Sequence, residues 1–494
     1  MEAVPQSQLT PQPPVPSGLG GLARAVLTVA PALAAGLAMR LWMLKDLFLV
    51  NGDSLIYGGL AKSLLLRGRY DLSIGGGAPV PTLIRLPGYP IFLAFCFRLF
   101  GMENYFAVTL VQIALELLGC LLLAEFAGRI APPGLARGAR LATLCLAALC
   151  PFTATYAVVP LTEAPTLFAF ALALWAMARF CGHPGWASAL WFTFAVTFAA
   201  FLRPDGALAA VALAPALVLA LRCGNPASAA IPPQNIKRIA LVCVLLALLP
   251  FAAWTVRNWQ TFHVFQPLAP RYAADPGQET YPGWQRWVKT WCLDFVSTYE
   301  VYWPVPGSPL DLGKLPSRAF DSPAQYAQTA ALASLYNNRD GATDILPDVD
   351  AGFGKLAGER IAAHPLRYYL WLPLGRLADM VLRPRVENLN IDLDWWVYAH
   401  HNAETRFSWA CAGLNALYLL LGAIGLCLRP RFWKAMLAYM LLRSALLLTV
   451  EAPEARYTLE FFPMLFALGG IALYWLTNRV CLSALKVKAS PGRG

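Results

Sequence analysis

The sequence is poor in charged residues and contains no cysteine spacing typical of a disulfide framework or a metal site. Charged side chains make up only 14% of its 494 residues, whereas a soluble globular domain carries roughly 25%. Its 11 cysteines include no CxxC pair and lie mostly within apolar runs, so neither disulfides nor a zinc site is expected. This composition excludes a disordered chain and an ordinary cytosolic enzyme.

Several functional motifs are also missing. No dense basic tract with interleaved aromatic residues occurs, so nucleic acid is not an expected partner. The three glycines at 75–77 are not followed by Lys-Ser or Lys-Thr, which excludes a P-loop. No internal repeat is evident, although many transporters are built from repeated halves. These absences disfavour nucleic-acid-binding, P-loop nucleotide-binding and repeat-built transporter classes.

Long apolar runs dominate what is present, and hydrophobic residues make up 58% of the chain. An α-helix needs roughly 20 apolar residues to cross about 30 Å of hydrocarbon. We therefore predict an all-α polytopic membrane protein. Its ten predicted spans are 23–44, 104–127, 141–160, 164–180, 187–202, 206–222, 239–256, 409–428, 434–450 and 458–477.

Two shorter apolar stretches, 88–100 and 367–382, are interrupted by arginines. Basic residues collect in cytoplasmic loops, and counting 88–100 as a span would move two basic clusters to the outer side. We interpret both stretches as helices that lie at the outer membrane surface or re-enter the membrane. Eleven to thirteen spans is the alternative.

The same rule predicts the domain organisation when the N-terminus is placed inside, in a chain whose formal net charge is +11. Composition suggests a bacterial inner membrane. The predicted segments are a disordered cytoplasmic tail at 1–22, a transmembrane core at 23–256 with a first outer loop at 45–103, an outer segment at 257–408, C-terminal spans at 409–477 and a cytoplasmic tail at 478–494.

The first outer loop predicts an amphipathic helix that starts near Asp53. Ile56, Leu60 and Leu64 recur at helical spacing, and a helix of this kind suits the membrane surface. The Asp53 carboxylate either caps the helix by accepting backbone N–H bonds or acts as a general base at the boundary between water and lipid. Spacing alone leaves both roles open.

Four arginines fall on the predicted outer face, where the positive-inside rule predicts few. Arginine binds phosphate through forked, charge-assisted hydrogen bonds. An anionic lipid phosphate would explain the four residues, and ion pairs with nearby Asp and Glu residues would explain them equally. They are Arg85, Arg203, Arg257 and Arg456.

The order of these motifs resembles the GT-C superfamily of membrane glycosyltransferases, in particular the protein O-mannosyltransferase and lipid A aminoarabinose transferase group. An acidic residue in the first outer loop comes first, and a surface helix ending in Gly-Arg-Tyr follows. The remaining motifs are Arg-Leu-Pro-Gly-Tyr-Pro at 85–90, Pro-Leu-Thr-Glu at 160–163, Arg-Pro-Asp-Gly at 203–206, Arg-Asn at 257–258 and Arg-Tyr at 456–457.

The resemblance implies a GT-C-like helical membrane domain with outer-face loops and juxtamembrane helices. It also implies transfer of a sugar from a polyprenyl-phosphate-linked donor to a hydroxyl of a lipid, glycan or protein acceptor on the outer face. Membrane lipids are further expected partners. The alternative functions are a transporter of lipid-linked sugars or small solutes and a non-catalytic assembly protein.

The resemblance also assigns roles to individual residues. Asp53 would be the catalytic base, and Glu163 would orient the acceptor, hold a divalent cation or cap its helix. Relatives often have two adjacent acidic residues where this chain has Asp53-Ser54, so no metal site or other cofactor is assigned. The expected substrate-binding residues are Tyr57, Arg85, Tyr89, Arg203, Asp205, Arg257, Arg456 and Tyr457.

Weaker signals lie elsewhere in the chain. Tryptophans at 284, 287, 291 and 303 would anchor the outer segment at the membrane interface or stack on sugars. The Asp392-x-Asp394 pattern is a weak candidate metal motif. The ionisable residues Glu116, Glu125 and Arg443 lie at apparent membrane depth and are expected to form structural pairs.

Overall fold

The computed structural model describes residues 19–73, 77–222, 233–338, 344–389, 391–396 and 402–488. Almost all regular structure in this part is helical, which confirms the predicted all-α class. Two short strands, β1 (Asp71–Leu72) and β2 (Val80–Pro81), pair antiparallel with Asp71 opposite Pro81. The predicted tails fall largely outside the described residues, as do Gly75 and Gly76. The described part of the C-terminal tail is helical through Lys488.

Besides β1 and β2, the described part of the N-terminal half contains ten α-helices and one 3₁₀ turn. They are α1 (Leu19–Leu47), α2 (Asp53–Arg67), α3 (Gly88–Phe100), α4 (Tyr105–Ile130), α5 (Ala136–Ala148), α6 (Pro151–Ala157), α7 (Glu163–Gly182), α8 (Trp186–Leu202), η1 (Pro204–Gly206), α9 (Ala207–Arg222) and α10 (Pro233–Phe262).

The C-terminal half mixes short helical turns with longer helices. They are α11 (Pro282–Lys289), α12 (Phe295–Ser297), η2 (Thr298–Tyr302), η3 (Leu312–Lys314), η4 (Ser317–Ala319), α13 (Pro323–Asn337), α14 (Pro347–Ala363), η5 (Arg367–Trp371), α15 (Leu372–Leu382), α16 (Asn402–Cys427), α17 (Trp433–Leu447), η6 (Ala455–Phe461) and α18 (Phe462–Lys488).

All ten apolar runs form helices, but they differ in length. Among the described residues, five helices are long and apolar enough to cross a membrane, or six if one bent pair counts as a span. The predicted span 141–160 is that pair: α5 and α6 meet at an angle of 54°. Pro151, the first residue of α6, lacks a backbone N–H and favours a helix start. The helices α8 and α9 are apolar but shorter, and α17 has 15 residues.

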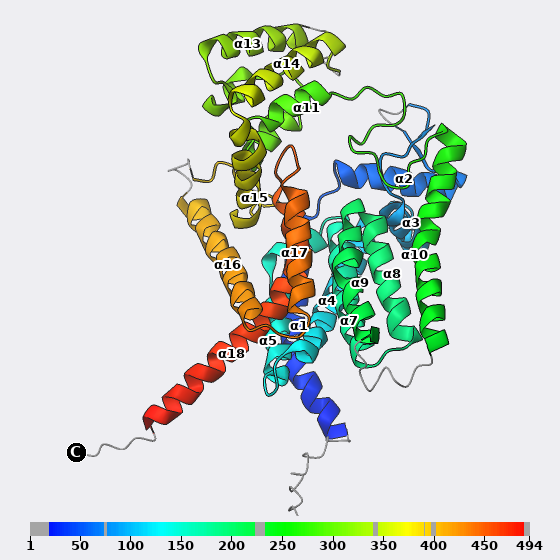
Figure 1. Cartoon of the computed structure of the whole chain (residues 1–494), viewed down its shortest axis with the longest axis vertical. Coiled ribbons are helices and arrows are strands. Elements are labelled where there is room, and N and C mark those ends of the chain that lie inside the picture. The colour runs from blue at the N-terminus through cyan, green and yellow to red at the C-terminus, as the bar shows by residue number, and fades with distance from the viewer. Residues whose placement is uncertain are drawn as a thin grey trace, which may run out of the picture.

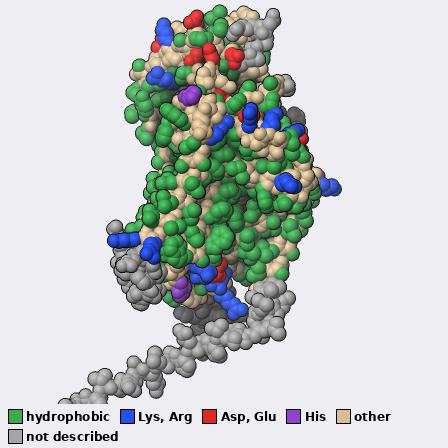
Figure 2. All heavy atoms as spheres, turned by 90° about the vertical axis from the view of Figure 1, so that its right-hand side faces the viewer, with side chains coloured by type: hydrophobic (Ala, Val, Ile, Leu, Met, Phe, Trp, Pro, Cys, Tyr) green, Lys and Arg blue, Asp and Glu red, His purple; other side chains and the backbone are tan. Residues whose placement is uncertain are grey.

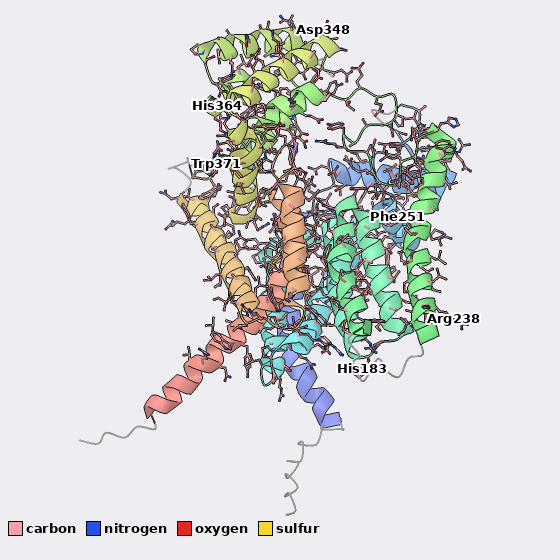
Figure 3. The ribbon with its side chains drawn as sticks, in the orientation of Figure 1. His183, Arg238, Phe251, Asp348, His364 and Trp371 are labelled. Atoms are coloured by element: carbon pink, nitrogen blue, oxygen red, sulfur yellow. The ribbon has the colours of Figure 1, made fainter. Side chains whose placement is uncertain are left out.

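The helical bundle has the surface pattern of a membrane protein. Figure 2 shows a broad band of apolar side chains between two ends where charged side chains gather. Figure 3 places Arg238 and His183 at the end of the bundle that faces away from α13 and α14, where Asp348 lies. This pattern is that of an integral, multi-pass protein with an apolar belt.

The centre of the bundle is α7, which is buried along nearly its whole length. It packs against α4, α8 and α9, while α18 packs against α5 and α16. Small residues permit these close contacts. A Cβ on Gly425 would come within 2.1 Å of the Leu468 carbonyl oxygen, and one on Gly138 within 2.1 Å of the Tyr474 ring.

The ionisable groups at membrane depth form ion pairs, as predicted. Glu116 pairs with the fully buried Arg40, and Glu125 pairs with Arg129 and Arg140. Arg443 also pairs, but its partners belong to the candidate site described below.

Part of the predicted outer segment forms a helical unit of its own at the end of the molecule opposite the C-terminus (Figure 1). Its helices α11, α13 and α14 share a hydrophobic core of their own. Trp284, Trp287 and Trp291 lie in this core, each 1% exposed, and Phe353 packs among them. The prediction that they anchor the segment at the membrane or stack on sugars is therefore wrong, because they are the apolar contents of this unit.

The first outer loop contains the predicted helix, but its apolar face is covered by protein. Ile56, Leu60 and Leu64 on α2 pack in one cluster with Leu83 and Trp254. The amphipathic pattern therefore reflects packing on the β1–β2 region and α10 rather than contact with lipid. Figure 1 shows α2 lying across the ends of α8 and α9.

Candidate active site

Asp53 is the first residue of α2, and its carboxylate is engaged by two arginines. Arg85 donates from Nη2 to Oδ1 at 2.9 Å, and Arg456 donates from Nη1 to Oδ2 at 3.5 Å. The N-cap residue is Gly52, which has a φ of 47° and no side-chain cap. Glycine adopts this left-handed conformation without penalty. Asp53 therefore does not cap the helix, because its oxygens form ion pairs across the site.

Glu163, at the start of α7, belongs to the same set of contacts. The side chain is 2% exposed, and its Oε1 lies 3.3 Å from Nη1 of Arg203 and 3.9 Å from Nη1 of Arg456. It makes no capping hydrogen bond, and Thr162 is the N-cap residue. Arg456 thus lies between the carboxylates of Asp53 and Glu163 and joins α2 to α7.

The network continues into the membrane bundle through Arg203 and Arg443. Arg203 lies 3.3 Å from Asp205 and 3.4 Å from Glu460. Arg443, on α17 and 1% exposed, pairs with Asp205 and also with Glu460 at 2.7 Å. Arg456 and the Tyr457 hydroxyl both donate to Glu454. The members of the network are the carboxylates of Asp53, Glu163, Asp205, Glu454 and Glu460 and the guanidiniums of Arg85, Arg203, Arg443 and Arg456.

A cavity of about 490 Å³ opens onto this network. We call it the central cavity. It collects eight of the ten residues that the sequence predicted for the site. They are Asp53, Tyr57, Arg85, Glu163, Arg203, Asp205, Arg456 and Tyr457.

Tyr89 and Arg257 do not line the central cavity. Tyr89 is fully buried, stacks edge-on against Tyr57, and donates its hydroxyl to Oε1 of Gln112 at 2.7 Å. Its one hydroxyl is used inside the protein, and its role in binding substrate stays a prediction. It supports Tyr57 from below.

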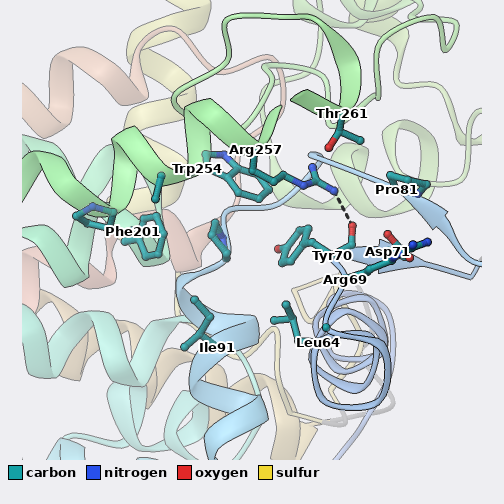
Figure 4. A pocket seen from close by; sticks show the side chains of 14 residues that line it. Leu64, Arg69, Tyr70, Asp71, Pro81, Ile91, Phe201, Trp254, Arg257 and Thr261 are labelled. Carbon is teal, nitrogen blue, oxygen red and sulfur yellow. Dashed lines mark hydrogen bonds between the residues drawn. The ribbon is translucent and has the colours of Figure 1, made fainter. Parts of the chain in front are cut away.

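Arg257 lies in a neighbouring groove of about 660 Å³, which we call the Arg257 groove. Its guanidinium donates to the carbonyl oxygens of Tyr70 and Thr82, each at 2.8 Å, and faces the Trp254 ring. Figure 4 shows it above an otherwise mostly apolar lining. Within the part of the chain that the structure describes, no carboxylate lies within ion-pair distance of it. Residues 84–87 separate the groove from the central cavity, since Arg85 lines one and Pro87 the other.

The charges set the protonation of Asp53 and Tyr57. Burial raises the pKa of Asp53, but the Arg85 and Arg456 charges outweigh it, so the pKa lies below its ordinary value. Burial raises the pKa of Tyr57 to about 12. At neutral pH the cavity therefore presents an ionised carboxylate beside a neutral phenol, which can accept and donate a hydrogen bond respectively.

The predicted site residues leave out three members of the network, namely Glu454, Glu460 and Arg443. Glu460 was hidden inside a predicted span, although an acidic residue in an apolar run is itself a functional signal. Arg443 was noticed, but only as a structural pair. No group of three or more His, Cys, Asp or Glu side chains in the described ranges is arranged to hold a metal ion. The neighbours of Glu163 are guanidiniums instead.

Comparison with known proteins supports the motif order. The model of the dolichyl-phosphate-mannose-protein mannosyltransferase family matches residues 81–256. The match includes Arg85, Glu163, Arg203 and Asp205 and ends just before Arg257. No curated protein matches the chain. The resemblance to membrane glycosyltransferases of the GT-C type is therefore confirmed, with residues 81–256 carrying the match.

Two solved structures share a low similarity over most of this chain. ArnT from Cupriavidus metallidurans, bound to undecaprenyl phosphate, is 16% identical over 92% of this chain and 76% of its own, with a TM-score of 0.37. The archaeal oligosaccharyltransferase AglB from Archaeoglobus fulgidus, in complex with an inhibitory peptide and a dolichol-phosphate, is 11% identical over 94% of this chain, with a TM-score of 0.43. The match covers 52% of the AglB chain.

Proposed function

We propose that this chain, a membrane glycosyltransferase of the GT-C type, moves a sugar from a polyprenyl-phosphate donor to an acceptor hydroxyl, with Asp53 as the general base. One observation carries the proposal. The Asp53 carboxylate lies in a cavity, between two guanidiniums, beside a groove with an arginine that has no carboxylate partner among the described residues. A base, cationic groups for a leaving phosphate and room for a lipid thus adjoin one another.

The Arg257 groove has the chemistry to hold the donor. A guanidinium has five N–H donors, and Arg257 uses three, toward Thr82, Asn258 and Tyr70. The remaining donors, and a charge that no described carboxylate approaches within ion-pair distance, suit a phosphate. The Asp71 carboxylate lines the same groove and offsets part of that charge. The apolar walls, which include Leu64, Ile91 and Phe201, suit an isoprenoid chain. The family description, which names a dolichyl-phosphate donor, agrees with this role.

The reaction then needs only groups that adjoin the two cavities. The acceptor oxygen bonds to the anomeric carbon while the bond from that carbon to the phosphate oxygen breaks. The phosphate leaves with the electron pair, and Arg85 and Arg257 stabilise its charge. Asp53 takes the hydroxyl proton. Because its pKa is lowered, Asp53 is a weak base and takes the proton late, when the new bond has made the hydroxyl acidic.

We place the reaction at the outer face of a bacterial inner membrane. Support comes from the opposite end of the bundle, where basic residues gather: Arg129 and Arg140 pair with Glu125, and Arg431 bonds to the carbonyl of Cys181. Basic ends of membrane proteins stay in the cytoplasm. The central cavity lies toward the other end, below the unit of α11, α13 and α14.

Transfer of a labelled sugar tests the proposal. Purified protein in lipid nanodiscs would receive radiolabelled polyprenyl-phosphate sugars, with membrane extract as acceptor. We expect Asp53→Asn to lose roughly 10²–10⁴ in rate, the contribution of general base catalysis. The matched control is Glu103→Gln, because Glu103 is an exposed acid of the same loop that pairs with Lys62 outside the cavity.

Two results would contradict the proposal. Equal transfer by the wild type and Asp53→Asn would remove Asp53 from the chemistry. No transfer with any donor, together with movement of the intact lipid-linked sugar across the bilayer, would instead indicate the transporter.

A further inference from the structure

A second cavity lies on the other side of Arg456 and has no assigned role so far. Its volume is about 590 Å³, and it shares Leu161 and Arg456 with the central cavity. The walls come from the end of α1, from η2 and from residues 387–389 and 391–394. We call it the acidic cavity. A molecule bound here would be separated from Asp53 by the Arg456 side chain, which bonds to Asp53 directly.

The lining of this cavity is strongly negative. Arg456 is its one cationic lining residue, and Glu454 already engages it. In the described structure, Glu300, Asp392 and Asp394 have no cation within ion-pair distance. Burial and the Asp294 carboxylate raise the pKa of Asp394, the Arg383 guanidinium lowers it, and the Asp392 carboxylate raises it again, so the pKa lies above its ordinary value. The acidic lining residues are Glu300, Glu387, Asp392, Asp394 and Glu454.

An exposed aromatic wall adjoins these carboxylates. Tyr299 and Trp303 are 52% and 45% exposed, and their ring centroids are 5.7 Å apart. Phe295 packs edge-on against Trp303 at 5.5 Å. Trp284, Trp287 and Trp291 are buried in the core formed by α11, α13 and α14, whereas Trp303 is exposed, as are Trp371 and Trp396 farther along the segment. Exposed aromatic faces in a cavity point to a ligand that packs on them.

One polar atom of the cavity lining is buried without a hydrogen bond. It is Nδ2 of Asn388, whereas the neighbouring Glu387 carboxylate pairs with Arg383 at 2.9 Å. Buried polar atoms almost always have hydrogen-bond partners. A bound molecule with a hydroxyl group would satisfy the Asn388 amide.

We propose that the acidic cavity binds the acceptor, and that this acceptor is a saccharide with at least one free ammonium group. The ligand's role as the acceptor rests on the proposed function, whereas the binding of an amino sugar in this cavity does not. The carboxylates would bind the ammonium group, and Tyr299 and Trp303 would pack on a sugar ring. The side-chain amide of Asn388 would donate a hydrogen bond to a ring hydroxyl. A neighbouring hydroxyl would lie against the Arg456 side chain, which bonds to Asp53.

The geometry favours a saccharide over a basic peptide. A cavity of this volume takes a ligand of a few rings. An amino sugar presents its ammonium and hydroxyl groups on one rigid ring, whereas lysine carries its charge on a flexible stem. Rigid groups lose less conformational entropy on binding. A hydroxyl would also satisfy the Asn388 amide, which an alkyl stem cannot do.

Direct binding without any donor tests the inference. Tryptophan fluorescence of the full chain in nanodiscs would be titrated with glucosamine oligomers and with N-acetylglucosamine oligomers of equal length. These probes differ only in acetylation of the amine. We expect saturable binding of the glucosamine oligomers that is at least about tenfold tighter, a difference of about 1.4 kcal/mol, and that weakens with salt.

Matched variants locate the binding. Asp392→Asn with Asp394→Asn should weaken it at least about tenfold, near 1.4 kcal/mol, whereas Asp348→Asn with Glu359→Gln removes the same charge from the distant α14 and should not. Trp303→Phe should abolish the fluorescence change. Trp396→Phe should preserve it, because Trp396 is 51% exposed but lies outside the lining.

Three outcomes would overturn the inference: equal binding of the acetylated probe, tighter binding of oligolysine than of the glucosamine oligomer, or no saturable binding. Oligolysine binding would indicate a peptide partner. Because no donor is present, none of these outcomes depends on sugar transfer. Asp53→Asn should bind the probe normally even where it transfers nothing.

Discussion

Arg203 in the central cavity and Arg257 in the neighbouring groove carry the same side chain but have different partners. Arg203 is surrounded by the carboxylates of Glu163, Asp205 and Glu460. Arg257 instead meets two carbonyl oxygens and three aromatic rings. The first is neutralised within the protein and fixes other groups in place. The second keeps its positive charge available to an anion.

Substitution of the two kinds of arginine should therefore have different consequences for the protein. Removing a neutralised arginine leaves buried carboxylates without a counter-charge. Removing an arginine without a carboxylate partner mainly takes away binding of an external anion. Stability and donor affinity are the two quantities that separate these cases.

The largest expected effect on stability is that of Arg443→Met. Arg443 is buried and holds both Asp205 and Glu460, and breaking a buried pair by removing one partner costs about 3–5 kcal/mol. We expect a large drop in thermal stability in nanodiscs, measured by tryptophan fluorescence. Arg431→Met is the matched control, because among the described residues Arg431 donates to the Cys181 carbonyl and lies over the Phe432 ring without forming an ion pair. Equal melting temperatures of the two variants would mean that the ion-pair network contributes nothing to thermal stability.

A smaller effect is expected for Arg257→Gln, and it should appear in donor binding. Loss of one phosphate contact should raise the KM for the donor by about tenfold, or about 1.4 kcal/mol, with kcat less affected. Melting should fall less than in Arg443→Met, because no carboxylate is left unpaired. Initial rates at varied donor concentration measure this. An unchanged KM would remove Arg257 from the donor site.

Arg85→Gln should shift the pH dependence of the rate. Arg85 is the nearer of two cations that lower the pKa of Asp53, and an adjacent cation typically lowers such a pKa by about 1–3 units. Its removal raises the pKa, so Asp53 becomes protonated at higher pH and activity is lost earlier on acidification. The acidic limb of kcat/KM against pH should move upward by about one unit. A limb that stays in place would mean that Asp53 does not titrate in that range.

These regions also show what the sequence could predict. The apolar runs gave the helices because hydrophobic periodicity and length are local properties. The motif order predicted eight residues that line one cavity in the fold, although they come from distant parts of the chain. Glu460 was not predicted as a site residue, because it lies in an apolar run that was assigned as a membrane span. Its place in the network depends on ion pairs with Arg203 and Arg443, and the packing of the helices brings these arginines near it.

Other errors have the same origin in packing. Tryptophan is favoured both at a membrane interface and in a protein core, so composition could not place Trp284 or Trp287 in the core of the outer unit. An acidic residue at a helix start can cap or pair, and Asp53 pairs because Arg85 and Arg456 approach from other elements. Spacing along one segment contains no information about those partners.

The smallest expected effect is that of Tyr89→Phe, which tests the neutral contacts that Tyr89 makes behind the charged lining of the central cavity. The change removes the hydrogen bond from the Tyr89 hydroxyl to Gln112 and leaves the ring against Tyr57. A neutral hydrogen bond contributes about 1 kcal/mol, so melting should fall slightly while donor KM and the pH profile stay unchanged. Tyr57→Phe is the matched comparison, because it removes the hydroxyl that faces the cavity. If Tyr89→Phe instead changed the donor KM, Tyr89 would act on the substrate and the division between lining and support would be wrong.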